Sequence, residues 1–242
     1  MKMNRGFYYD LLDIDQQVLY KKIGKAVANM EEEISVRENL DAQQLKKIFM
    51  AISYDNPKYF YWNSNKSEWK DGKVTLQYEM TKEEAQQVTE KLVEEREKFL
   101  KECNAETQAD KEKILLRLYE YLANHVEYAY EELQNLESSS KIYSIQGALL
   151  DKKAVCLGIA QTVNYFLSAL HIPHILVTGE AKIGGNMENH AWNMVKVNDK
   201  YRHIDVTAEI CDGKDLQYKY FLLQDWELGN RKMPKDIYPP AK

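Results

Sequence analysis

Two stretches within residues 144–205 decide the fold: residues 151–170, DKKAVCLGIAQTVNYFLSAL, and residues 190–205, HAWNMVKVNDKYRHID. The first has a short polar approach and then apolar residues at spacings of three and four, which is typical of a buried helix. This helix is expected to begin near Cys156 and to end before Pro173, which forbids its continuation. A helix N-terminus carries partial positive charge and unpaired N–H groups, which stabilise a thiolate over a thiol. Cys156 is therefore a candidate nucleophile.

The second stretch predicts an antiparallel hairpin. Its alternating runs are residues 190–197 and 201–206. Asn198 and Asp199 join them, and both residue types tolerate the positive φ values of a two-residue turn. In this register His190 lies opposite Thr207, so His190 and Asp205 share one face as diagonal neighbours, about 7 Å apart at their backbones. The hairpin is thus expected to bring a histidine and a carboxylate within side-chain reach.

The helix and the hairpin together predict a Cys–His–Asp site. Cys156 supplies the nucleophile, His190 the general base and Asp205 the carboxylate that orients the base. His203 lies on the same face as Asp205 and is the alternative base. His190 is preferred, because its diagonal position leaves the ring room to reach both partners.

Two further residues are candidates for supporting roles. The backbone N–H of Cys156 is a sound donor to an oxyanion, and the side-chain amide of Gln146 is a candidate second donor. The alternative for Gln146 is a structural turn residue. Trp192 shares the face of His190 and is expected either to wall the cleft or to fill the core.

Several blocks between Gly147 and Asp225 resemble the transglutaminase-like superfamily in its bacterial form. In family order they are GALL at 147–150, AVCLG at 154–158, TG at 178–179, NHAWN at 189–193, HIDVT at 203–207 and YFL at 220–222. The resemblance implies an α+β, papain-like fold in which a nucleophile helix packs on an antiparallel sheet. It also implies that Cys156, His190 and Asp205 are the catalytic triad. Ile159 stands where an aromatic residue is common, and Gln146 where tyrosine is frequent, which bears on substrate preference.

The composition limits the class of protein and its partners. With 44% hydrophobic residues in 242, the chain can bury a core in one large or two modest domains. A net charge of -5 without a Lys/Arg-dense stretch argues against a nucleic-acid partner. No run approaches the roughly 20 apolar residues of a membrane span, and Met1 to Gln17 lack a signal-like apolar run. We expect a cytoplasmic protein without a membrane partner; a secreted protein whose leader has been removed is the alternative.

The three cysteines are an odd number at wide spacing. Cys103, Cys156 and Cys211 predict neither a disulfide framework nor a structural zinc site. They fit a reducing compartment, in which a thiolate at Cys156 would survive, and Cys103 and Cys211 are expected to be incidental. The sequence predicts no metal and no cofactor, and it leaves the oligomeric state open.

The chain is expected to divide into a helix-rich N-terminal region with a small β element, residues 1–108, and a catalytic domain, residues 109–242. Expected helices cover 7–34, 41–56, 81–103 and 110–128, and expected strands cover 59–62, 74–80 and 218–223. The two N-terminal strands either form a hairpin or extend the main sheet. Residues 131–140 are expected to form a loop, and the tail from 234 to 242 is expected to be extended and to add little.

The predicted chemistry is acyl transfer on a peptide or protein substrate. The thiolate of Cys156 attacks a peptide or glutamine-type amide, and a thioester forms as ammonia or an amine leaves. Water then gives a protease or amidase, whereas an amine gives cross-linking. The resemblance slightly favours hydrolysis, because the family includes proteases and amidases and the sequence shows no calcium-loop motif. The alternative is a catalytically silent module that binds a peptide or protein.

Overall fold

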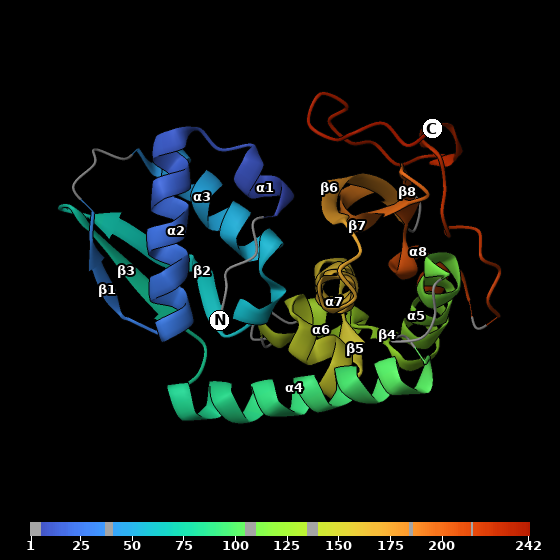
Figure 1. Ribbon diagram of the computed structural model, residues 1–242, viewed down its shortest axis with the longest axis horizontal. Coiled ribbons are helices and arrows are strands. Elements are labelled where there is room, and N and C mark those ends of the chain that lie inside the picture. The colour runs from blue at the N-terminus through green and yellow to red at the C-terminus, as the bar shows by residue number, and fades with distance from the viewer. Residues whose placement is uncertain (1–5, 37–40, 105–109, 135–139, 184–185, 214) are drawn as a thin grey trace. The chain divides into compact units, whose positions relative to one another are not determined.

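The computed structural model describes residues 6–36, 41–104, 110–134, 140–183, 186–213 and 215–242, and the chain divides into two compact units, Met1–Thr89 and Glu90–Lys242 (Figure 1). The division falls inside α4 (Lys82–Glu102). The catalytic-domain boundary predicted between residues 108 and 109 lies past the end of that helix and stays a prediction. None of the helices described is long and apolar enough to cross a membrane.

The first unit packs helices against a small antiparallel sheet. Its helices are α1 (Phe7–Asp10), α2 (Ile14–Asn29), α3 (Ala42–Asp55) and the short η1 (Pro57–Tyr59), and its strands are β1 (Glu33–Ser35), β2 (Trp62–Lys70) and β3 (Lys73–Tyr78), in the order β1-β3-β2. Asp41 caps α3 as predicted, and its carboxylate accepts from the Gln44 N–H at 2.7 Å. Leu19, Ile23, Ile48, Val74 and Leu76 are fully buried and contribute to the core.

Two predictions for this unit needed correction. The helical region expected to reach residue 34 ends at Met30, whose φ of 55° is left-handed, and β1 follows. The aromatic strand expected at 59–62 is wrong for its first three residues. Tyr59 ends the 3-10 helix that Pro57 starts, residues 60–61 form a turn, and pairing begins at Trp62 opposite Tyr78. Of the two arrangements left open, β2 and β3 form a hairpin, and with β1 they make a three-stranded sheet separate from the main sheet.

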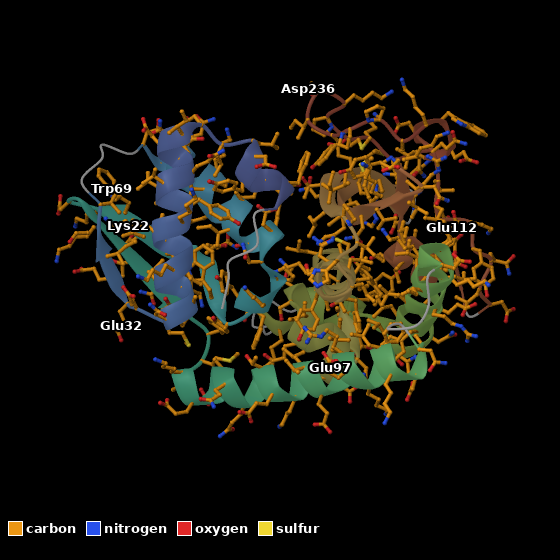
Figure 2. All side chains as sticks on the ribbon, viewed as in Figure 1. Lys22, Glu32, Trp69, Glu97, Glu112 and Asp236 are labelled. Atoms are coloured by element: carbon orange, nitrogen blue, oxygen red, sulfur yellow. The ribbon has the colours of Figure 1, made fainter. Side chains whose placement is uncertain are left out.

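The second unit contains the remaining elements. They are α5 (Lys111–His125), β4 (Glu127–Tyr128), α6 (Tyr130–Gln134), η2 (Ser140–Tyr143), η3 (Gly147–Asp151), β5 (Lys153–Ala154), α7 (Cys156–Ala169), β6 (His174–Ile183), β7 (Asn186–Val197), β8 (Lys200–Ile204), α8 (Val206–Asp212) and η4 (Asp225–Glu227). Helix α4 begins in the first unit with the predicted capping box of Thr81 and Glu84. Asp110 caps α5, and Glu112 lies in the first turn of that helix (Figure 2). The Glu112 carboxylate accepts from the side chain of Asn198 at 2.9 Å.

Helix α7, which begins at Cys156, packs on an antiparallel sheet, as the resemblance implies. Strands β6, β7 and β8 form that sheet in sequence order, and α7 lies beside it (Figure 1). Buried Asn193 of β7 donates to the Ala160 carbonyl and to the Asn164 side chain, both at 2.9 Å, which fixes α7 on the strand. The fold class is therefore confirmed as α+β, with a helix on an antiparallel sheet.

The hairpin turn agrees with the prediction, but its second strand is shorter. Val197 pairs with Lys200, and Asn198 and Asp199 have φ values of 49° and 61°. The run expected to continue to Val206 ends at Ile204, because Asp205 caps α8 and turns the chain into a helix. Strand β6 completes the sheet and had not been predicted.

Three other predictions for this unit also needed correction. The expected strand at 218–223 is irregular, with left-handed Tyr218 and Leu222 and a single bridge from Leu223 to β8. Within the loop expected at 131–140, Tyr130–Gln134 is helical and Ser140 begins η2, while 135–139 lie outside the described residues. The tail adds packing: the N–H of Thr178 donates to buried Tyr238 at 3.0 Å.

Candidate active site

Cys156 is the first residue of α7, where the sequence placed it. Val155 before it is extended, with φ -93° and ψ 176°, and makes no side-chain cap, so the N–H groups of the first turn remain available to an anion. The approach is held in place by the Val155 N–H, which donates to the Ile142 carbonyl at 3.0 Å. A side chain at Gly158 would overlap that same carbonyl oxygen, so the helix start needs glycine there. The Cys156 thiol itself is half-buried.

His190 and Asp205 meet in the interior. The Nε2 of His190 lies 2.8 Å from Oδ2 of Asp205, and both side chains are buried. His190 projects from β7, whereas Asp205 has left β8 and caps α8 by accepting the Ala208 N–H at 3.0 Å. The pair therefore forms at the exit of the strand rather than within it.

The electrostatics of the pair favour an imidazolium beside a carboxylate. Burial lowers the pKa of His190, but Asp205 and then Cys156 outweigh it and raise the pKa to about 9. Burial alone would raise the pKa of Asp205, yet the charge of His190, the Arg231 guanidinium and the Ala208 N–H hold it at about 2. Both shifts describe one buried ion pair.

The second ring nitrogen of His190 faces a different environment. Nδ1 is buried and has no hydrogen-bond partner within the described ranges of the chain. A buried polar atom without a partner costs free energy and calls for an explanation. Cys156 lies near enough to raise the pKa of His190, so Nδ1 is the nitrogen available to the cysteine while Nε2 is occupied by Asp205.

The alternative base, His203, is engaged elsewhere. Its Nδ1 accepts from the indole N–H of Trp192 at 3.0 Å, and its Nε2 lies 2.9 Å from the Asp225 carboxylate. Burial lowers the pKa of His203, which fits a neutral ring that accepts on one nitrogen and donates on the other. His203 thus serves to orient Trp192. Both of its ring nitrogens have partners other than Cys156, whereas Nδ1 of His190 is available to the cysteine.

Trp192 and Gln146 are both buried. The Trp192 ring stacks on His190 with centroids 5.7 Å apart and is 1% exposed, so it fills the core behind the histidine. Gln146 precedes η3, and its N–H donates to the Ser144 hydroxyl at 3.3 Å. In the part of the chain that the structure describes, the Gln146 amide makes no hydrogen bond to Cys156. An oxyanion role for Gln146 and a cleft-wall role for Trp192 stay predictions.

Two neighbours of the site were not found from the sequence. Arg231 donates from Nε to Oδ2 of Asp205 at 2.7 Å, and it comes from a segment without periodicity that could signal the contact. Cys211 of α8, expected to be incidental, lies close enough to Tyr130 and to Cys156 for both to influence the pKa of its thiol. Among the described residues no three His, Cys, Asp or Glu side chains gather as a metal site.

Residues 97–206, which include Cys156, His190 and Asp205, match the family model of the Transglutaminase-like superfamily. The resemblance read from the sequence is thereby confirmed for this part of the chain, which matches a transglutaminase-like domain.

Solved structures give weaker likenesses. The crystal structure of a TGase shares 17% identity with this chain at a TM-score of 0.44, covering 76% of this chain and 52% of that one. The periplasmic domain of TgpA from Pseudomonas aeruginosa, bound to ethylmercury, shares 19% identity at a TM-score of 0.38, covering 50% of this chain and 46% of that one. The chain thus spans about half the length of these two structures. No curated protein matches it.

Proposed function

We propose that this protein is a cysteine-dependent acyl-transfer enzyme that acts on peptide or glutamine-type amides through a thioester. The supporting observation is the His190 ring, which uses one nitrogen for Asp205 and keeps the other buried and unpaired on the side available to Cys156. In this reading Cys156 is the nucleophile, His190 the proton carrier and Asp205 the orienting carboxylate. The substrate is a peptide or a protein.

The tautomer follows from the hydrogen bonds. A neutral His190 keeps its proton on Nε2, because that nitrogen faces the Asp205 carboxylate, and so Nδ1 carries the lone pair that takes the proton of Cys156. The raised pKa of His190, about 9, makes the resulting imidazolium stable at neutral pH. A thiolate–imidazolium pair at the start of α7 is the form that attacks.

The reaction balances without a cofactor. The Cys156 sulfur forms a bond to the amide carbonyl carbon, and the negative charge on oxygen is accepted by N–H groups at the helix start. The C–N bond then breaks as His190 gives its proton to the leaving ammonia or amine. Water attacks the thioester with His190 as base, which releases the acid and regenerates the thiol. Hydrolysis is slightly favoured over amine cross-linking by the family resemblance and by the absence of a calcium-loop motif from the sequence.

The first test needs no substrate. Burial raises the pKa of the Cys103 and Cys211 thiols, so at about pH 6 both stay protonated and react slowly with iodoacetamide. We expect Cys156 to be alkylated at least about tenfold faster than either, as measured by peptide mass spectrometry. Equal, slow labelling of all three cysteines would contradict the proposal and favour the silent binding module.

The second test separates the outcomes of the thioester. A glutamine-containing peptide library is screened for released ammonia, for new peptide termini and for incorporation of a fluorescent amine. Hydrolysis predicts released ammonia or new peptide termini without incorporation of the fluorescent amine. The Cys156→Ser variant should lose all signals, while Cys103→Ser, the matched control, should keep them. Activity that survives in Cys156→Ser would refute the assignment of the nucleophile.

A further inference from the structure

The C-terminal segment, residues 223–242, is bound to the edges of the main sheet. Leu223 and His203 of β8 exchange two backbone hydrogen bonds, with N···O distances of 2.8 and 2.9 Å. Lys232 and Glu180 of β6 exchange two more, both at 2.8 Å. Arg231 lies next to the second of these bridges. Its backbone is therefore anchored, and its side chain enters the protein from a fixed point.

Arg231 contacts the same carboxylate oxygen as His190. Its Nε donates to Oδ2 of Asp205 at 2.7 Å, while His190 Nε2 is 2.8 Å from that oxygen. The Arg231 side chain is 8% exposed and lies over the ring of Tyr220, with 4.5 Å between the guanidinium carbon and the ring centroid. A second donor of the guanidinium reaches the Leu228 carbonyl at 3.4 Å. Such a buried, stacked guanidinium is held in one orientation.

We propose that Arg231 is a positioning residue for acyl transfer: it locks the Asp205 carboxylate in place and offsets part of its charge, which sets how tightly His190 holds its proton. This inference rests on the proposed function. An arginine stays charged at all working pH values, so Asp205 remains a carboxylate and does not accept the proton from His190. A cation beside the carboxylate also repels the imidazolium, and removing that cation strengthens the hold of Asp205 on the His190 proton.

Other titratable or charged side chains surround the pair and are unchanged by substitution of Arg231. They are Cys156 of α7, Tyr119 of α5, His203 of β8, Cys211 of α8, and Tyr220 and Asp225 of the chain after α8. His203 is neutral at the pH of interest, because burial lowers its pKa. Arg231 is thus the one permanent cation that contacts Asp205 among the described residues.

A purely structural ion pair would make a different prediction. If Arg231 only ties the C-terminal segment down, its loss lowers stability and leaves the proton affinity of His190 unchanged. Arg202 offers the matched control, because it bonds the Lys242 carbonyl in the same segment and does not contact Asp205. Arg202→Gln should loosen the segment without shifting the His190 titration.

The experiment is a titration of the His190 ring by 15N NMR in the full chain, compared among wild type, Arg231→Gln, Arg231→Lys and Arg202→Gln. We expect Arg231→Gln to raise the proton affinity of His190 about tenfold, because it removes a positive charge bound to the same carboxylate oxygen as His190. Arg231→Lys, which keeps the charge, should return it to within about threefold of wild type. In Arg231→Gln the pH profile of Cys156 alkylation should move in the same direction as the His190 titration, toward higher pH.

An unchanged His190 titration in folded Arg231→Gln would overturn the proposal. Should that variant fail to fold, Tyr220→Leu removes the ring on which the guanidinium stacks but keeps the backbone carbonyl that accepts the Asp205 N–H, and a rise in the proton affinity of His190 is again expected. No shift in folded Tyr220→Leu, or a shift in Arg231→Lys as large as the tenfold one expected of Arg231→Gln, would then overturn it. If the wild-type protein carries out acyl transfer but the His190 titration does not shift in Arg231→Gln, only the role of Arg231 is refuted and the proposed function stands. If the His190 titration shifts but the wild-type protein carries out no acyl transfer, the effect of Arg231 on the His190 proton is supported and the proposed function is refuted.

Discussion

Replacing Asp205 by asparagine removes the charge on which the candidate site depends while keeping its shape. The carboxylate is 2% exposed and accepts from His190, Arg231 and the Ala208 N–H. Asparagine caps a helix about as well as aspartate, so α8 should still form. Without the negative charge, burial acts on the imidazolium almost unopposed, and the pKa of His190 should fall from about 9 to below its usual 6.5.

The size of the effect follows from the raised pKa of His190. A rise from 6.5 to about 9 corresponds to about 3 kcal/mol, or roughly 300-fold in proton affinity. Because the folded-state pKa lies above the unfolded one, this stability is fully present below about pH 6.5 and is lost as the pH rises through about 9. Wild-type protein should therefore lose about 3 kcal/mol of unfolding free energy across that window, and Asp205→Asn should lose almost none of it.

The acid side has the opposite sign. The pKa of Asp205 is lowered on folding, so its contribution is present above the ordinary value near 3.8 and is lost as the pH falls toward 2. Both contributions come from one ion pair and are counted once. Arg231 loses its partner in Asp205→Asn, which adds a cost of about 3–5 kcal/mol at every pH, and Asp205→Asn/Arg231→Gln should recover part of it.

The assays are urea denaturation from about pH 6 to 9 and NMR titration of the His190 ring, with wild type measured in parallel. Cys156 alkylation at about pH 6 should slow in the variant toward the rates of Cys103 and Cys211. A folded Asp205→Asn protein in which His190 still titrates near 9 would refute the reasoning, because the raised pKa would then have a source other than Asp205.

Three other predictions concern the support of the two units. Burial raises the pKa of Asp55 to about 7, so the stability that Asp55 contributes to the first unit should be full below about pH 4 and decline up to pH 7. Hydrogen exchange should show that decline in the wild type and not in Asp55→Asn. Glu209→Gln should cost about 1–3 kcal/mol in urea denaturation, because Glu209 is buried and accepts the Tyr119 hydroxyl at 2.7 Å. Gly179→Ala should release the C-terminal segment, seen as faster exchange there, because the added methyl would overlap the Lys232 carbonyl.

The parts of the site predicted correctly from sequence depend on local rules. The helix start at Cys156 follows from apolar spacing after a polar approach, and the hairpin turn follows from two residue types that accept positive φ. Once the turn at Asn198 and Asp199 is known, strand parity fixes which side chains of the two strands share a face. These rules act over a few residues, so they are visible in one sequence.

The parts that were missed depend on contacts between distant segments. Residues 218–223 alternate like a strand, but left-handed Tyr218 and Leu222 break the ladder and leave one bridge to β8. Likewise, the end of β8 is decided by Asp205, which satisfies an N–H of α8 while its second oxygen takes two donors. An irregular segment has no hydrophobic periodicity from which its contacts can be predicted. The contact of Arg231 with Asp205 could therefore not be predicted from the sequence.

The charge balance explains why an irregular segment should supply the fourth group. In the proposed resting form, a thiolate at Cys156 and a carboxylate at Asp205 accompany only one imidazolium, at His190. Those three groups carry a net negative charge in an interior where unbalanced charge is costly. The guanidinium of Arg231, 2.7 Å from the carboxylate, brings the sum to zero. The buried charge that the helix and the hairpin bring together is thus balanced by a residue that lies outside both of them, and outside residues 97–206 that match the family.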